Sequence, residues 1–358
     1  MPSLKEIKGR INSISSTLAI TSAMKMVAAA KLQKAQMAIQ NMLPYERRLY
    51  SMLVDLMGAM NISAAASEDG SVRGSGSAER GFDQSGDRLS LSNRHDLAGM
   101  DGAYSLMAQR EVRKVAIVAF ASNSSLCGAF NSNVIREATA VINEYRASGL
   151  RDSDIVVYSV GRKMAEAMRK LGFPSPADFT KMSDSPSYEA ASALAQELLD
   201  GFVSGRFDKV ELVYNHYKST SSQPTIRQTY LPLSLADATA DIQVGKITDS
   251  ASESDTNRGA ESVGAPVVRQ GSPTTEDLIV EPSKEALIAT LLPKVIRLRI
   301  FTTLLDSAAA EHAARTVAMQ LATDNGNDLL QELTLEYNKG RQQKITSEIL
   351  DLVGGSMQ

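Results

Sequence analysis

The sequence predicts an α/β protein in which the two chain ends form a long antiparallel two-helix coiled coil and the middle folds as a compact domain. Apolar residues recur at helical spacing at both ends, and Val-rich and Ile-rich runs alternate with helical patterns in the middle. Two stretches rich in Gly and Ser separate these parts. We therefore divide the chain into residues 1–60, 61–110, 111–244, 245–277 and 278–358.

Residues 3–57 have the pattern of one long helix, because apolar side chains recur in alternating steps of three and four residues. Ser3 followed by Glu6 fits a capping box at its start. Pro44 is expected to kink or locally break the helix. The apolar positions that begin the pattern are Leu4, Ile7, Ile11, Ile14 and Leu18.

The central part, residues 111–244, changes its period. Short runs rich in Val, Ile and Tyr predict strands, and longer amphipathic patterns between them predict helices. This alternation indicates βαβ units with a largely parallel sheet, and hence a Rossmann-like α/β domain. The strands are expected at residues 112–121, 154–160, 209–217 and 225–235, and the helices at 131–148, 161–171 and 187–203.

The stretches 61–110 and 245–277 are expected to be flexible insertions, because they are rich in Gly and Ser and have no apolar periodicity. The Gly-rich string GSGSAERG at 74–81 is not a phosphate-binding G-x-G-x-x-G motif, and no P-loop motif occurs elsewhere. A flexible linker is therefore the better interpretation of the glycines.

Residues 284–353 form the second long helical pattern. Pro293 is expected to interrupt its start, so that the main body runs from about Lys294. The string TDNGND at 323–328 allows a break, because Asn-Gly is a turn signal. Two end helices of similar length most simply pair antiparallel, since a helix this long with an apolar stripe needs a partner. The resulting rod suits mechanical or spanning work better than catalysis.

The composition argues against several classes of protein. The net charge of −3 gives no global basic field for nucleic acid or anionic lipid. A single cysteine excludes a disulfide framework and a multi-Cys metal cluster, and three distant histidines argue against a His-rich metal site. The N-terminus lacks an apolar segment and no apolar run could span a bilayer, so neither a secreted nor an integral membrane protein is expected.

Few residues are candidates for chemistry. Cys127 follows a strand and precedes an expected helix N-cap at Ser132 or Asn133, and a buried structural thiol is the better interpretation. His216 is expected to be partly buried in a strand, and His95 falls in the first insertion. We expect no catalytic residue, metal site or cofactor here.

His312 lies between Glu311 and Arg315, which are expected to form an ion pair on the helix surface.

The segment AITSAMKMVAAAKL at 19–32 is apolar on several faces, with Ile20, Met24 and Val27 as a second stripe. A two-stranded coiled coil would bury only one stripe. Either this helix is buried within its own protein, or the tip inserts into a cavity of a partner, which Ala and Met would suit.

The two ends and one central motif resemble the γ subunit family of F-type ATP synthases. The run SLKEIKGRINSISSTLAITSAMKMVAAAKLQKAQ is similar to the family's first helix, and AEHAARTVAMQLATDNGNDLLQELTLEYNKGRQQKITSEILDLVGG to its last. SLCGAFNSN resembles the family's G-L-C-G-x-x-N segment. The family's S-D-R-G is replaced by SNSS at 122–125, which puts an ion-pair role of that loop in doubt.

The resemblance implies a coiled coil inside a ring of α and β subunits, with the α/β domain at its foot against the ε subunit and the c-ring. Proton flow would turn the c-ring and this chain with it, so that each β subunit changes its nucleotide affinity in turn. The chain itself would be a non-catalytic subunit without cofactor or nucleic-acid partner. It would associate with the cell (inner) membrane peripherally, through the c-ring only and on the cytoplasmic side.

The resemblance also implies five residues that contact the α/β ring. Met24 matches the family's methionine that faces the β-subunit lever, and Arg315 matches its motif arginine. Arg341, Gln342 and Thr346 match positions that contact the catch loops of β. A solvated or intra-coil residue is the alternative for each of them.

Two other functions remain open from the sequence. One is a non-enzymatic coiled-coil adaptor with a different use of the same helices. The other is a nucleotide-binding enzyme on the central domain, which would need a cluster of acid, base or nucleophile that the sequence does not show.

Overall fold

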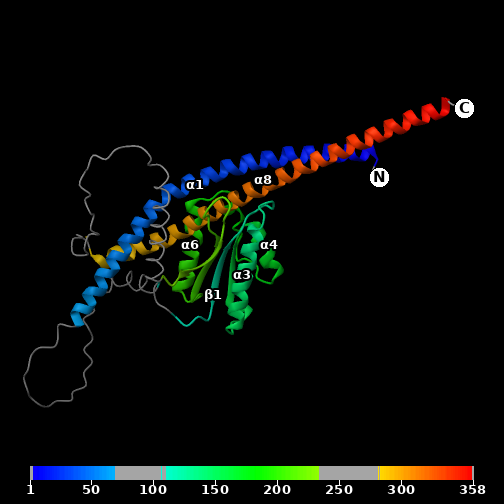
Figure 1. Cartoon of the computed structure of the whole chain (residues 1–358). Helices are drawn as coiled ribbons and strands as arrows, with labels where there is room; N and C mark the ends of the chain where they lie inside the picture. Colours follow the sequence, from blue (N-terminus) through cyan, green and yellow to red (C-terminus); the bar gives the residue numbers. More distant parts are fainter. Residues whose placement is uncertain (1–2, 69–105, 107–109, 234–280, 282, 357–358) are drawn as a thin grey trace, which may run out of the picture.

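A computed structural model describes residues 3–68, 106, 110–233, 281 and 283–356. Two long helices lie side by side and run in opposite directions, and a smaller domain with a four-stranded sheet packs against one part of them (Figure 1). The expected insertion at 245–277 lies outside the described residues, as does most of the one at 61–110.

The first helix, α1 (Leu4–Glu68), extends beyond the expected end and spans about 97 Å. The backbone N–H of Glu6 donates to Ser3 Oγ at 3.2 Å, which confirms half of the predicted capping box. Of the kink or local break expected at Pro44, the break is absent, because the helix continues through this residue. Contacts on both sides hold the helix in place there, with Leu32 packed on the second long helix and Leu53 in the main core.

The second long helix, α8 (Lys284–Ser356), spans about 110 Å and is also uninterrupted. The expectation that the helix starts after Pro293 is wrong, because Leu292 and Val295 on either side are fully buried and fix the backbone. The break allowed at 323–328 is absent as well. Gly326 allows the two long helices to approach closely and does not form a turn. A Cβ at this position would lie 2.6 Å from Cδ2 of Leu18 on α1.

The sheet has the strand order β2-β1-β3-β4. β1 (Val115–Phe120) pairs in parallel with β2 (Ile155–Val160) and with β3 (Lys209–Asn215), which confirms the largely parallel sheet. Val115 lies opposite Ile155 on one side and Lys209 on the other. The edge strand β4 (Thr225–Leu231) is antiparallel to β3.

The helices of the domain follow the predicted pattern closely. They are α3 (Phe130–Ala147), α4 (Arg162–Lys170) and α6 (Tyr188–Val203). A short helix, α5 (Thr180–Asp184), and a 3-10 turn, η2 (Asp152–Asp154), were not expected. Ser187 caps α6, because its side chain accepts from the backbone N–H of Ala190.

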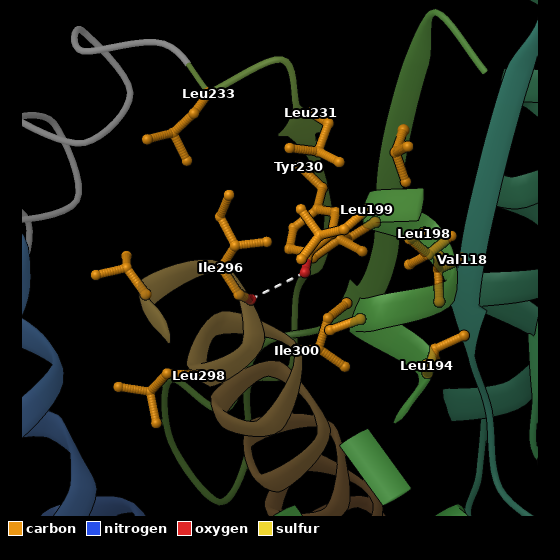
Figure 2. Packing of buried hydrophobic residues seen from close by; sticks show 14 of the residues in the cluster. Val118, Leu194, Leu198, Leu199, Tyr230, Leu231, Leu233, Ile296, Leu298 and Ile300 are labelled. Atoms are coloured by element: carbon orange, nitrogen blue, oxygen red, sulfur yellow. Dashed lines mark hydrogen bonds between the residues drawn. The ribbon is translucent and has the colours of Figure 1, made fainter. Parts of the chain in front are cut away.

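Each face of the sheet has its own core. α3 and α4 cover one face, where Ile117, Val141 and Met164 are buried together. α6 and α8 cover the other face, and the end of α1 joins this larger core through Leu53. Figure 2 shows how Ile296 and Ile300 of α8 meet leucines of α6 and Tyr230 of β4. The Tyr230 hydroxyl donates to the backbone oxygen of Ile296 at 2.9 Å. The domain therefore binds α8 through apolar packing and a buried hydrogen bond.

Candidate partner-contact surface

Beyond the domain, α1 and α8 face each other along one stripe. Half-buried residues of α8 recur there in steps of three and four. The hydroxyls of Thr21 and Thr323 are hydrogen-bonded at 3.1 Å, which fixes the pairing of the two helices. The stripe consists of Thr323, Gly326, Leu330, Leu333, Tyr337 and Gly340.

The end of α8 extends past the start of α1 (Figure 1). Leu4, the first residue of α1, lies beside Gly340, where a Cβ would be 3.1 Å from its Cδ2. Every residue from 341 to 353 is exposed. We call residues 341–353 the overhang. Its large apolar side chains include Leu350, which is 65% exposed, and Leu352, which is 74% exposed. A row of exposed apolar residues of this kind marks an interaction surface.

α1 contributes a second exposed apolar area. Ile20, Met26 and Val27 are 61%, 69% and 57% exposed, and Met24 is half-buried beside them. Because these side chains lie outside the stripe that pairs with α8, the described part of the chain does not bury them. Of the two alternatives for this segment, the structure favours a tip whose apolar faces remain open.

The five sequence-predicted contact residues fall into two groups. Arg341, Gln342 and Thr346 all lie on the overhang and are exposed. The Thr346 hydroxyl donates to the backbone oxygen of Gln342 at 2.9 Å, which ties this side chain down along the helix. Met24 lies on α1 and Arg315 on α8, so neither belongs to the overhang.

Arg315 has a different environment from the other four. The ion pair with Glu311 exists, at 2.7 Å, but its expected place on the helix surface is wrong. Both residues are buried, with 9% and 8% of their surfaces exposed. The guanidinium also donates to Oγ of Ser124, at 2.8 Å. The SNSS loop thus contacts Arg315 through the Ser124 hydroxyl, and this contact is a hydrogen bond to a neutral group, not an ion pair.

The neighbouring His312 is neutral at pH 7. Burial lowers its pKa to about 4, and the positive charges of Arg315 and Lys31 act in the same direction. Nδ1 of His312 lies 3.4 Å from the Arg315 guanidinium, a position that suits an uncharged acceptor. Burial also raises the pKa of Glu311, and the Arg315 charge opposes that rise.

Cys127 is buried and free, as expected for a structural thiol. The helix that follows begins at Phe130 with Ala129 as its N-cap, so the expected cap at Ser132 or Asn133 is wrong. The side chain of Asn131 instead turns back and donates to the Cys127 sulfur at 3.1 Å.

His216 and Tyr217 lie just after β3, because the strand expected at 209–217 ends at Asn215. The expected partial burial of His216 is confirmed, but its expected place within a strand is wrong. His216 Nδ1 is 2.6 Å from Oδ2 of Asp306 on α8, and this hydrogen bond raises the pKa of His216. Tyr217 touches both long helices. The only indication of these contacts in the sequence was Asp306, an acidic residue next to the apolar stripe of α8.

The usual ligand site of a parallel sheet is filled. Small molecules bind outside the carboxyl ends of such strands. Here α8 crosses those ends, and Phe120, Val160 and Leu304 leave a cavity of only about 10 Å³ between them. That is room for about one water molecule. Among the residues that the structure describes, no group of three or more His, Cys, Asp or Glu could hold a metal ion. Over the same residues, none of the helices is apolar enough to cross a membrane.

Comparison with known proteins gives consistent results. The family model described as ATP synthase matches residues 3–357. The ATP synthase gamma chain of Phocaeicola vulgatus is 46% identical over 357 residues, and the match covers 100% of both chains. The ATP synthase gamma chain of Bacteroides thetaiotaomicron is 45% identical over 358 residues, again with 100% of both chains covered.

Solved structures agree in fold. A chain of the Euglena gracilis mitochondrial ATP synthase in rotational state 3 has a TM-score of 0.54 at 18% identity, covering 99% of this chain and 93% of that one. A chain from the rotor of the same assembly in rotational state 1 has a TM-score of 0.51 at 18% identity, covering 96% and 98%. The family model and the identity over the full length together show that this chain belongs to the ATP synthase gamma chain family.

Proposed function

We propose that this gamma chain is the central-stalk rotor of an F-type ATP synthase. It turns with the c-ring and couples proton flow to ATP synthesis in the ring of α and β subunits. Its membership of the gamma chain family supports this function, as does its fold, which it shares with a rotor chain. The observation that carries the proposal is the overhang of α8, a helix end whose exposed apolar side chains the described residues of this chain leave uncovered.

The paired helices act as an antiparallel coiled coil. The stripe on α8 with steps of three and four supports this, since it is the spacing of a coiled-coil seam. Leu18 meets Gly326 and Leu4 meets Gly340, so the two contacts lie two heptads apart on both helices. The central domain is Rossmann-like, a proposal supported by three parallel strands in the order β2-β1-β3 with helices on both faces.

The apolar tip fits a bearing surface. Burying one Leu or Ile side chain is worth about 1.5–3 kcal/mol, so the large side chains of the overhang stabilise a complex that surrounds them. Such burial has no directional preference, which lets the surface turn against its partner. Fixed ion pairs would instead favour one orientation. The ring of α and β subunits is the partner that we propose for this surface.

Specific contacts follow from the positions of the residues. Arg341, Gln342 and Thr346 meet the catch loops of β, and their place on the exposed overhang supports this. Met24 meets the β-subunit lever from the open side of α1. Arg315 could reach a partner only through the 9% of its surface that stays exposed, because it is engaged with Glu311 and Ser124.

The chain is a non-catalytic subunit without a cofactor in this account. The filled carboxyl end of the sheet supports that role. The foot of the molecule meets the ε subunit and the c-ring, and the chain is held at the cytoplasmic side of the cell (inner) membrane through the c-ring only. The chain itself supplies shape and stiffness, and its partners supply the chemistry.

A reconstitution experiment tests this function. The chain is coexpressed with the α and β subunits of its host, and ATP hydrolysis of the purified complex is measured. Three variants are compared with the full chain: a truncation after Gly340, the double substitution Ile349→Ser and Leu352→Ser in the overhang, and Leu171→Ser as the control. Leu171 is a 46% exposed leucine on the globular domain.

We expect a stable complex whose hydrolysis falls in the truncated and doubly substituted forms and stays unchanged with Leu171→Ser. Failure of the full chain to assemble with α and β would overturn the proposed function. Unchanged hydrolysis after truncation would show that the overhang is not the contact surface.

A further inference from the structure

The chain segment just after β3 lies between both long helices and the globular domain. The ring of Tyr217 packs against a cluster formed by Leu32 of α1 and Ala309 and Ala313 of α8. It also packs against a second cluster that contains Phe130, the first residue of α3. One side chain of the domain therefore touches both helices of the pair at the same level.

Polar contacts fix this segment more closely. The Tyr217 hydroxyl accepts from Nε2 of Gln36 on α1 at 2.6 Å, and its backbone N–H donates to Oδ1 of Asp306 on α8 at 2.9 Å. The other oxygen of Asp306 is bonded to His216. Asp306 thus uses both carboxylate oxygens on two successive residues of the domain. We call Gln36, His216, Tyr217 and Asp306 the exit clamp.

The exit clamp lies between the main core and the last hydrogen bond from the domain to α8, which joins Ser124 to Arg315. Below it, α8 is buried in the main core from Ile288 to Leu304. Above it, Met319 is the last buried residue of α8, and the helix is exposed or half-buried from there to Val353. A rod held at one end and loaded at the other is strained most where it leaves its support. Any load on the tip therefore passes to the domain through the contacts that lie between Arg315 and the exit clamp, and at the clamp the domain is bonded to both helices.

Interdigitated apolar side chains resist rotation of a helix by steric contact, whereas the hydrophobic effect itself has no direction. Hydrogen bonds weaken steeply when their angles change. Directional contacts to both helices at this one level therefore oppose rotation of the helix pair relative to the domain.

We propose that the exit clamp positions the helix pair against the α/β domain, so that rotation of the domain reaches the tip without a lag in angle. The inference rests on the proposed rotor function. Its four members are positioning residues, since they act on the tip through the helices. Loss of the clamp would leave the chain folded and able to assemble, but with a loosened angle between domain and tip.

Two substitutions remove one bond of the clamp with little change in shape. Tyr217→Phe keeps the ring between the helices and removes the hydroxyl, and Gln36→Leu removes the donor. Tyr145→Phe is the matched control, because its hydroxyl donates to Glu211 at 2.7 Å on the opposite face of the sheet. It loses a tyrosine hydrogen bond of the same kind without touching the helix pair.

The experiment uses the complex with α and β subunits immobilised on a surface, with a bead attached to the globular domain. The width of the angular distribution is measured while the tip is held during a pause. Tyr217→Phe and Gln36→Leu should each raise the population of off-angle orientations about fivefold, which is the effect of one hydrogen bond. The double variant should add little to either one, since both remove the same bond. Tyr145→Phe should keep the width of the unmodified chain.

Two outcomes would overturn the inference. One is an angular width that is the same in all variants. The other is equal broadening by Tyr145→Phe, which would indicate a general loss of stability. Failure of the unmodified chain to assemble or to turn would instead count against the proposed rotor function, so the two failures are distinguishable.

Discussion

Three of the glycines within the long helices, Gly9, Gly326 and Gly340, give a graded test of how closely the two helices approach. Replacing a helical Gly by Ala stabilises a helix by about 1 kcal/mol if the methyl group has room. At Gly9 the added Cβ meets nothing within 4 Å, at Gly340 it lies 3.1 Å from Leu4, and at Gly326 it lies 2.6 Å from Leu18. The same chemical change is therefore made at three increasing degrees of crowding.

The expected signs differ along the series. Gly9→Ala should stabilise the helix by about 1 kcal/mol. Gly326→Ala gains the same propensity but overpacks the contact with Leu18, which costs about 1–3 kcal/mol, so a net loss of up to about 2 kcal/mol is expected. Gly340→Ala should fall between the two, because Leu4 begins its helix and can move aside.

Hydrogen exchange followed by mass spectrometry measures this in the full chain. Amides of α1 and α8 near Leu18 and Gly326 report local opening of the helix pair. Gly326→Ala should speed their exchange, and the added change Leu18→Ala should restore protection, because the shorter side chain makes room for the methyl group. If Gly326→Ala protects these amides as well as Gly9→Ala protects its own, the two helices do not meet at Leu18 as described.

Three further predictions concern the domain and its junction with the helices. Asp306 raises the pKa of His216 above its usual 6.5, so the stability gained is complete below pH 6.5 and is lost as pH rises through the folded value. The melting temperature of the chain should therefore fall toward that of Asp306→Asn over that window, and a constant difference would contradict this. Arg315→Met leaves Glu311 buried without its partner and should cost about 3–5 kcal/mol in denaturant unfolding, whereas adding Glu311→Leu should recover most of the loss. Leu198→Ala should destabilise the domain by about 2–5 kcal/mol, since Leu198 is fully buried in the main core, and a loss below 1 kcal/mol would contradict that packing.

Much of the fold could be predicted because it depends on local pattern. The strands β1 and β2 are short runs rich in Val and Ile. Both faces of these strands are buried, which explains why apolar and polar residues do not alternate along them. The start of α6 lies within one residue of the expected position, and the side chain of Ser187 caps the helix there. Each of these features is decided by residues close together in the chain.

The errors occurred where distant contacts outweigh local preference. Pro44, Pro293 and the Asn-Gly at 325–326 all predict interruptions, yet both helices continue, since the partner helix and the core hold the backbone on either side. Gly326 shows the reason directly, because the small residue is needed for Leu18 and not for a turn.

The candidate site shows the same division. The positions of Arg341, Gln342 and Thr346 on an exposed helix end could be expected from the resemblance of the last helix. The spacing of Glu311 and Arg315 predicted their pairing but could not reveal burial, because a surface pair has the same spacing. The exit clamp had no signal of this kind, since its contacts join parts of the chain far apart in sequence.

The sequence left an adaptor and a nucleotide-binding enzyme as alternatives. Membership of the gamma chain family supports neither of these alternatives. The cavity at the carboxyl end of the sheet is too small for a nucleotide. An adaptor would use the overhang as a fixed binding site, whereas a rotor must turn against its partner.

Direct observation of rotation distinguishes these functions. The complex of this chain with its α and β subunits is fixed to a surface through the ring, a bead is attached to the globular domain, and ATP is added. The account predicts rotation in one direction that requires ATP and stops when it is removed. A complex that hydrolyses ATP while the bead stays fixed relative to the ring would contradict the central claim that this chain is the rotor.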